Sequence, residues 1–293
     1  MSRPLAAISV DVDPVDLHLM GYGFKGLPAD PLAMSTALPR LLGLFQRCGV
    51  RTTLFTVGRD AQTHAGVLRA AVAAGHEIAS HTLKHPMRFA GLPEKRKRLE
   101  LVESKAALEK ASGAPVIGFR APNFDMAARV LPLLVEAGYR YDASAYPTPV
   151  LLASRAVLAM KSAHPPSVLA MKPWPFTWKR QPYDWTAHGV TIREFPLAVT
   201  PGLRLPVYHT LRYFTNERRF LQQLDQFVAR GEQFSYCLHA VDALGLTEDH
   251  VDARFGKHPG MDRKLDGKLE LLERSLRAIA ERFDVKPYAE QLG

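Results

Sequence analysis

Two histidines stand four residues apart in the stretch "ASHTLKHP", directly after a short apolar run. If this segment turns helically, the imidazoles of His81 and His85 share one face. A histidine pair of this kind is a common binding site for a divalent metal ion. The spacing alone is a weak signal, because a metal site needs at least one more ligand and a fold that brings the ligands together.

Two aspartates follow the first strand-like segment of the chain. Asp11 and Asp13 are two residues apart, so in an extended chain their side chains point to the same side. One carboxylate and two imidazoles form a common divalent metal site with positions left open for water and substrate. A second carboxylate beside such a metal usually deprotonates its water. The four residues together predict a hydrolytic metal centre.

Strand-like and helix-like segments alternate along the chain, which predicts parallel strands joined by helical crossovers. About seven such units favour a barrel over an open sheet. A stretch rich in proline and tryptophan, residues 146–190, interrupts the alternation and is expected to be a long insertion over one rim. The expected strands are 5–11, 51–57, 76–81, 116–120, 191–199 and 234–240, and the expected helices are 36–48, 61–74, 93–111, 125–137, 217–230 and 263–283.

The polar residues that could do chemistry each follow a different predicted strand. In barrels and open α/β sheets the active site lies at the carboxyl ends of the strands. Asp11, His81, Arg120 and His239 stand at such ends, so we expect them on one rim. The histidines without such a placement are expected on the surface or in the core: His64, His76, His164, His188, His209, His250 and His258.

The order of these motifs resembles the polysaccharide deacetylase superfamily, carbohydrate esterase family 4. The matching stretches are "SVDVD", "SHTLKH", "GFRAPNF", "YRYDAS" and "YCLHA", in family order from residue 9 to about 240. The resemblance implies a single α/β domain over residues 1–293, a distorted (β/α)7 barrel, and a hydrolase that uses one divalent transition metal. By this resemblance, Asp13, His81 and His85 would bind the metal. Asp11 would be the base and His239 the acid, and Arg120 would pair with Asp11.

Four further residues are expected to touch or to support the substrate. A backbone N–H near Asn123 would help to stabilise the oxyanion, and Asp142 would orient His239. Trp174 and Trp178 lie in the insertion and would line a sugar groove or a membrane-facing surface. Zn²⁺ suits two imidazoles and one carboxylate and is the expected metal, although other first-row ions fit the same ligands.

Two departures from the family pattern concern the substrate. Many members have adjacent aspartates where this chain has Asp-Val-Asp, and Cys237 stands where leucine is usual. The Asp-x-Asp form is similar to a subset that includes cyclic-amide hydrolases resembling allantoinases and deformylases of lipid-linked amino sugars. Both departures leave the metal ligands, the base and the acid in place.

Composition and charge limit where such an enzyme would work. The 293 residues are 47% hydrophobic and 23% charged, which is typical of a globular domain. Two cysteines make no disulfide framework, and we find neither a secretory signal nor an apolar stretch of about 18 residues. A cytoplasmic protein is therefore expected. The net charge of +9 favours anionic membranes or phosphate carriers, and no aromatic-basic pattern indicates nucleic acid.

The expected function is removal of an acetyl or formyl group from an N-acylated amino sugar, with a lipid-linked sugar at the cytoplasmic membrane surface favoured. One alternative within enzymes is hydrolysis of a cyclic amide or imide. A second alternative is a phosphate-binding protein whose barrel has lost catalysis. The second is disfavoured because the metal ligands, the base and the acid are all present, and a non-catalytic binder has no need of the set.

Overall fold

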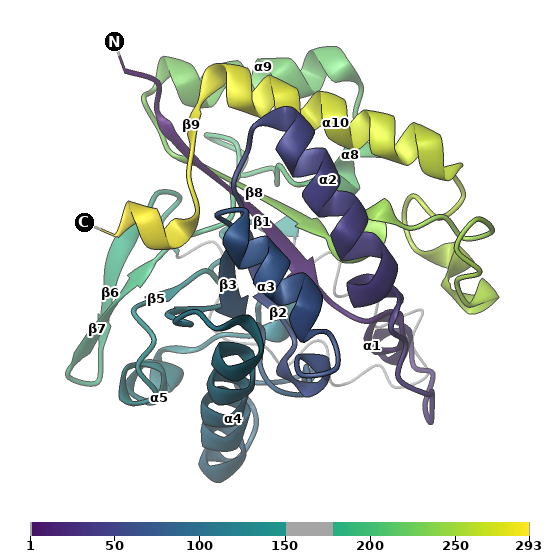
Figure 1. Ribbon diagram of the computed structural model, residues 1–293. Helices are drawn as coiled ribbons and strands as arrows, with labels where there is room; N and C mark the ends of the chain where they lie inside the picture. Colours follow the sequence, from purple (N-terminus) through teal and green to yellow (C-terminus); the bar gives the residue numbers. More distant parts are fainter. Residues whose placement is uncertain (1, 151–177, 293) are drawn as a thin grey trace.

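The computed structural model describes residues 2–150 and 178–292. Its strands form one sheet in the order β6-β7-β5-β4-β3-β2-β1-β8, and β9 pairs with β1 at the amino-terminal end of that strand (Figure 1). The strands are β1 (Leu5–Val12), β2 (Thr53–Thr56), β3 (Glu77–Ser80), β4 (Gly118–Phe119), β5 (Tyr141–Asp142), β6 (Tyr183–Ala187), β7 (Val190–Glu194), β8 (Phe234–His239) and β9 (Asp284–Val285).

Seven of these strands, from β7 along the path to β8, run parallel to their neighbours. The sheet curls into a distorted barrel, as the sequence predicts, and β6 and β8 are the two ends of its strand path. The described helices are α1 (Val15–Gly21), α2 (Leu38–Cys48), α3 (Ala65–Ala73), α4 (Glu94–Ser112), α5 (Leu131–Glu136), α8 (His209–Arg212), α9 (Glu217–Ala229) and α10 (Leu265–Arg282).

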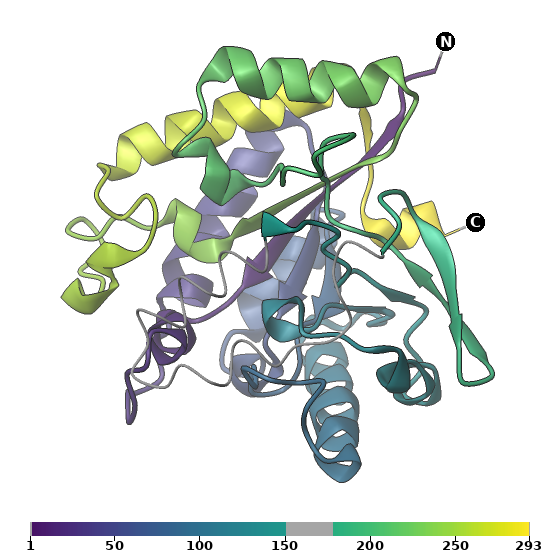
Figure 2. The same ribbon diagram turned by 180° about the vertical axis from the view of Figure 1, so that it is seen from behind.

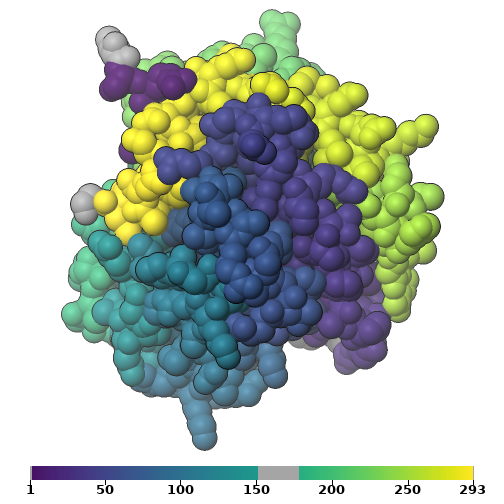
Figure 3. Space-filling model, viewed as in Figure 1, coloured from purple at the N-terminus to yellow at the C-terminus, as the bar shows by residue number. Residues whose placement is uncertain are grey.

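The sheet has an outer face that the helices cover and an inner face that carries the polar residues. In Figure 1, α2 and α3 lie across the strands, and in the space-filling view these helices and α10 form a continuous surface (Figure 3). Seen from behind, the strands curve around the opposite face (Figure 2). Because side chains alternate along a strand, Ile8 and Val10 of β1 join the helix-facing core, whereas Ala7, Ser9 and Asp11 face inward.

Most predicted elements are confirmed, with shorter ends. The strand expected at 191–199 stops at Glu194, and the helix expected at 125–137 is α5 preceded by a 3₁₀ turn. Our prediction missed α1, α8 and the short strands β5 and β9. A two-residue strand has too few residues to show any alternation, so no periodic signal marks it in the sequence.

The stretch at 146–190, predicted as one insertion, is described by the structure only in part. Its end forms β6, which pairs with β7 as an antiparallel hairpin at the edge of the sheet, through a turn at His188 and Gly189. Its central part, 151–177, lies outside the described residues, so the expected insertion over the rim stays a prediction. Within the described ranges, no helix is long and apolar enough to cross a membrane.

Candidate metal centre

Parallel register brings the predicted base and acid together. β1 and β8 are neighbours, and Asp11 is the register partner of His239. Residues in register on adjacent strands point to the same face, so both side chains rise from the inner face of the barrel. His239 Nε2 lies 4.0 Å from Asp11 Oδ2, and the Asp11 carboxylate is buried.

The two histidines of "SHTLKH" meet in a way that the sequence does not predict. Their ring centroids are 5.0 Å apart, but residues 81–86 form a loop and not a helical turn. Thr82 and His85 have φ values of 66° and 51°, a left-handed conformation that side chains other than glycine seldom adopt. The His85 N–H donates to Thr82 Oγ1 (3.0 Å) and the Gly58 N–H donates to Thr82 O (2.9 Å), so neighbouring contacts hold the loop.

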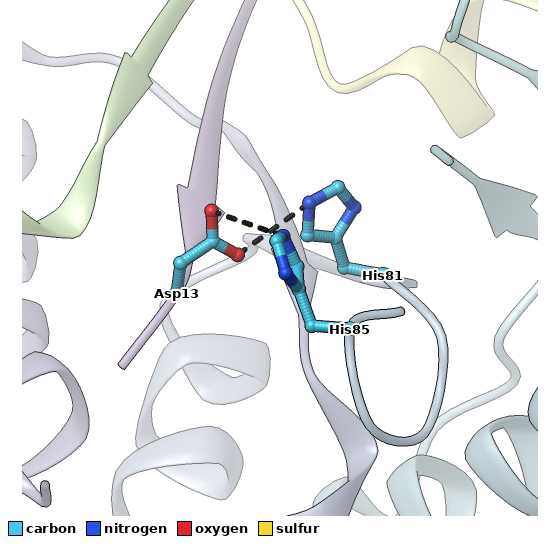
Figure 4. A group of neighbouring side chains, drawn as sticks. All are labelled: Asp13, His81 and His85. Atoms are coloured by element: carbon cyan, nitrogen blue, oxygen red, sulfur yellow. Dashed lines mark ion pairs between the residues drawn. The ribbon is translucent and has the colours of Figure 1, made fainter. Parts of the chain in front are cut away.

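Asp13, His81 and His85 converge just beyond the ends of β1 and β3 (Figure 4). His81 Nε2 lies 3.4 Å from Asp13 Oδ1, and His85 Nε2 lies 3.6 Å from Asp13 Oδ2. One donor atom from each side chain falls within 4.8 Å of the others, and all three residues are buried. This spacing is compatible with three ligands of one small cation.

The chemistry of these donors fits a divalent metal. Asp13 Oδ1 is buried and has no hydrogen-bond partner in the described part of the chain, which is costly for a carboxylate oxygen. Burial lowers the pKa of His85 to about 4 and lowers that of His81, so both rings are neutral ligands near pH 7. The Nδ1–H of His81 donates to Arg120 O (2.8 Å), which leaves its Nε2 lone pair for the metal.

Arg120 is the predicted partner of Asp11, and the structure confirms the pair. Its Nη1 donates to Asp11 Oδ1 (2.5 Å) and to Ser9 Oγ (3.0 Å). The guanidinium is fully buried and stacks on Phe55, with Cζ 4.0 Å from the ring centroid. Burial alone would raise the pKa of Asp11, but the positive charge and the hydrogen bond of Arg120 outweigh it, so that pKa is lowered and Asp11 is ionised.

A cavity of about 160 Å³ opens above these residues. Asn123 lines it and has a left-handed φ of 53°, and its contact with substrate stays a prediction. The rest of its lining is formed by Asp11, Asp13, Leu17, His18, Gly21, Tyr22, His81, His85, Met87, Phe124 and His239.

The structure does not bring Asp142 to His239, so that prediction is wrong. Asp142 ends β5, which four strands separate from β8 along the sheet, and accepts a hydrogen bond from Ser144 Oγ (2.5 Å). It is fully buried beside Glu194, and burial raises its pKa to about 6. The position of Asp142 relative to His239 depends on which strands pair, and the sequence did not reveal β5.

Trp178, one of the two tryptophans expected to contact substrate, does not line the cavity. Trp178 is buried and packs against Trp185, with ring centroids 6.3 Å apart. Its carbonyl oxygen accepts a hydrogen bond from Arg204 Nη1 (2.9 Å), which is a structural contact. Trp174 lies outside the described residues, so its contact with substrate stays a prediction.

Sequence reasoning missed two residues near the site and misplaced a third. His18 of α1 lines the cavity, and the carboxylate of Asp242 accepts from the backbone N–H of His239 (2.9 Å) and from Tyr213 Oη (3.0 Å). His258, expected on the surface or in the core away from the site, lies against His18 with ring centroids 5.3 Å apart. The Asp242 contact had a local signal, an aspartate three residues after a strand-end histidine.

Removing either histidine of the centre should abolish tight metal binding. His81→Ala and His85→Ala each delete one of three ligands, so affinity should fall by more than the roughly 10–100-fold that loss of an outer partner costs. Metal content after gel filtration and competition with a chromophoric chelator measure it. His64→Ala, a half-buried histidine that does not line the cavity, is the control. Full occupancy in the double variant would refute the assignment.

Comparisons with known proteins agree with this geometry. Residues 26–141 match the family model described as polysaccharide deacetylase. A Helicobacter pylori protein named peptidoglycan deacetylase is 30% identical over 144 residues, which are 48% of this chain and 49% of that protein. The alignment thus spans about half the length of this relative.

Solved structures share the fold over nearly the whole chain. A family 4 carbohydrate esterase from Streptomyces lividans, solved in complex with acetate, has a TM-score of 0.51 at 14% identity and covers 96% of this chain and 90% of its own. The PuuE allantoinase has a TM-score of 0.58 at 18% identity, covering 99% and 89%. At these identities the likeness establishes the fold alone.

The fold is a distorted barrel with polar residues at the carboxyl ends of its parallel strands. Over residues 26–141 the chain is similar to the polysaccharide deacetylase family, which agrees with the resemblance seen in the sequence. The matched segment contains His81, His85 and Arg120, whereas Asp11, Asp13 and His239 lie outside it and join the site only through the fold.

Proposed function

We propose that this chain is a metal-dependent hydrolase that removes an acetyl or formyl group from the nitrogen of an amino sugar. One observation carries the proposal. A buried aspartate paired with arginine, Asp11, and an imidazole 4.0 Å from it, His239, face one cavity together with the Asp13, His81 and His85 cluster. Base, acid and metal ligands in one small cavity are the components that amide hydrolysis requires.

The metal ligands and the base have separate tasks in this proposal. A divalent ion held by Asp13, His81 and His85 would supply Lewis-acid chemistry, polarising the acyl carbonyl and making water more acidic. Asp11 accepts the proton of the attacking water, and its pairing with Arg120 keeps it ionised and oriented.

His239 is the proposed general acid, which protonates the leaving nitrogen. Hydrolysis of an amide would expel an unstable nitrogen anion unless a proton reaches the nitrogen, so an acid is required. The imidazole of His239 lies at the cavity wall, and the hydrogen bond from its backbone N–H to Asp242 fixes the turn that begins there. Protonated His239 delivers the proton to the leaving amine.

The family match and the named activity of the Helicobacter pylori relative support a sugar N-acyl group as the substrate. The similarity to the allantoinase extends to the fold alone, so it does not support a cyclic amide as the substrate. The complete set of ligands, base and acid argues against a barrel that only binds phosphate.

The proposal also specifies the cell compartment in which the substrate is found. Two free cysteines, Cys48 and Cys237, support a reducing compartment and hence a cytoplasmic enzyme. Leu203 and Phe214 are 76% and 73% exposed, and the chain carries a net charge of +9. Exposed apolar side chains on a basic protein favour a membrane surface and a lipid-linked amino sugar.

Turnover of defined substrates tests the function. The metal-loaded chain should release one acid per free amine from N-acetylated or N-formylated amino sugars, and chelation should stop the reaction until metal is restored. N-acetylglucosamine oligomers, peptidoglycan fragments and small cyclic amides form the panel, with acetate or formate and new amine both measured. The proposal would be contradicted if the protein hydrolysed only cyclic amides, or if metal-loaded protein hydrolysed no substrate of the panel.

A further inference from the structure

His18 carries an imidazole, 13% exposed as a side chain, that the proposed reaction does not use. It lies on α1, lines the cavity, and presents a buried Nε2 that has no hydrogen-bond partner in the described part of the chain. That nitrogen faces the metal centre, 4.0 Å from Asp13 Oδ2. An unpartnered buried nitrogen is costly, so its position beside Asp13 calls for a physical reason.

The geometry disfavours His18 as a fourth ligand of the same ion. Among the described residues, the group whose donor atoms all lie within 4.8 Å of one another contains Asp13, His81 and His85, and does not include His18. Its distance from Asp13 Oδ2 is also longer than a hydrogen bond. A shift of about 1 Å by either group would bring the two atoms to hydrogen-bonding distance.

We propose that His18 is a positioning residue of the metal centre, whose Nε2–H donates to the Asp13 carboxylate when the site is loaded. The proposal rests on the metal dependence proposed above. Ligands of metal sites are normally oriented by outer hydrogen bonds, and His81 already has one to Arg120 O. His18 gives Asp13 the same support, which fixes the carboxylate toward the ion.

A cluster of rings holds His18 in this position. His239 and His258 pack edge-on against its ring with centroids 5.6 and 5.3 Å away, and Phe255 lies 5.5 Å away. His258 in turn stacks on Phe255 at 4.5 Å and shares a hydrogen bond between its Nδ1 and Tyr22 Oη (2.8 Å). A segment far along the chain, residues 253–258, thereby supports the helix that carries His18.

The test measures metal affinity and needs no substrate. His18→Phe keeps a ring in the cluster and removes the donor, so affinity for Zn²⁺ and Co²⁺ should fall roughly 10–100-fold in chelator competition. His18→Gln retains an N–H donor and should recover most of the loss. His64→Phe, at a half-buried histidine that does not line the cavity, should leave affinity unchanged. Circular dichroism confirms that each variant is folded.

Each outcome decides the proposal. Weaker binding in His18→Phe with rescue by His18→Gln, and an unchanged Co²⁺ absorption spectrum, supports a positioning role. A Co²⁺ spectrum that loses a nitrogen ligand would make His18 a direct ligand and overturn it. So would affinity within twofold of wild type, or equal losses in the Phe and Gln variants. If wild-type protein binds no metal, both proposals fail, whereas a metal-binding protein without sugar turnover contradicts the proposed function alone.

Discussion

Replacing Asp11 with asparagine should lower kcat by about 10²–10⁴-fold while the protein keeps its metal. The amide cannot accept a proton from water, and Asp11 is not among the three clustered ligands. Turnover of an N-acetylated sugar and metal content, measured on the same sample, test both halves of the prediction. Near wild-type turnover would place the base elsewhere.

A matched control separates the loss of a base from the loss of an Arg120 contact. Asp11→Asn removes the counter-ion of a fully buried guanidinium, so the variant should also be less stable. Ser9→Ala removes a different hydrogen bond of Arg120 and leaves the carboxylate in place. We expect Ser9→Ala to retain most of its turnover, and a loss equal to that of Asp11→Asn would show that Arg120 placement, not proton transfer, limits the rate.

Replacing Arg120 with leucine should lower the free energy of unfolding by about 3–5 kcal/mol at pH 7, because Asp11 becomes a buried charge without a partner. In wild type the pKa of Asp11 is lowered, so its stabilising contribution is present above the unfolded pKa and is lost as pH falls through the folded pKa. Without Arg120, burial dominates and raises that pKa above its unfolded value. The destabilisation should therefore grow as pH rises and shrink toward pH 4.

Urea unfolding at several pH values between 4 and 8 measures this pattern. Arg120→Lys keeps the charge but not the planar fork, so it should lose less stability and keep Asp11 ionised. In activity profiles, the acidic limb should move to higher pH in the leucine variant and stay near wild type in the lysine variant. A stability loss in the leucine variant that does not change with pH would contradict the proposed control of Asp11 by Arg120.

The sequence by itself determined the candidate site residues and the strand ends that carry them. A spacing of two placed Asp11 and Asp13 on one side of an extended chain, and the apolar runs before His81, Arg120 and His239 marked parallel strands. These features are local, because strand periodicity and helix boundaries depend on residues a few positions apart. The shared rim then follows from the rule that parallel strands end on one side of a barrel, and the family resemblance implied the Arg120–Asp11 pair.

Only the tertiary structure decided which residues meet across the rim. The pairing of β1 with β8 puts His239 beside Asp11, whereas the place of β5 puts Asp142 with Glu194 and away from His239. The left-handed turn at His85 and the approach of His258 to His18 depend on contacts between distant segments. No pattern within a few residues encodes such contacts, because they form only when packing offsets the cost of ordering the chain.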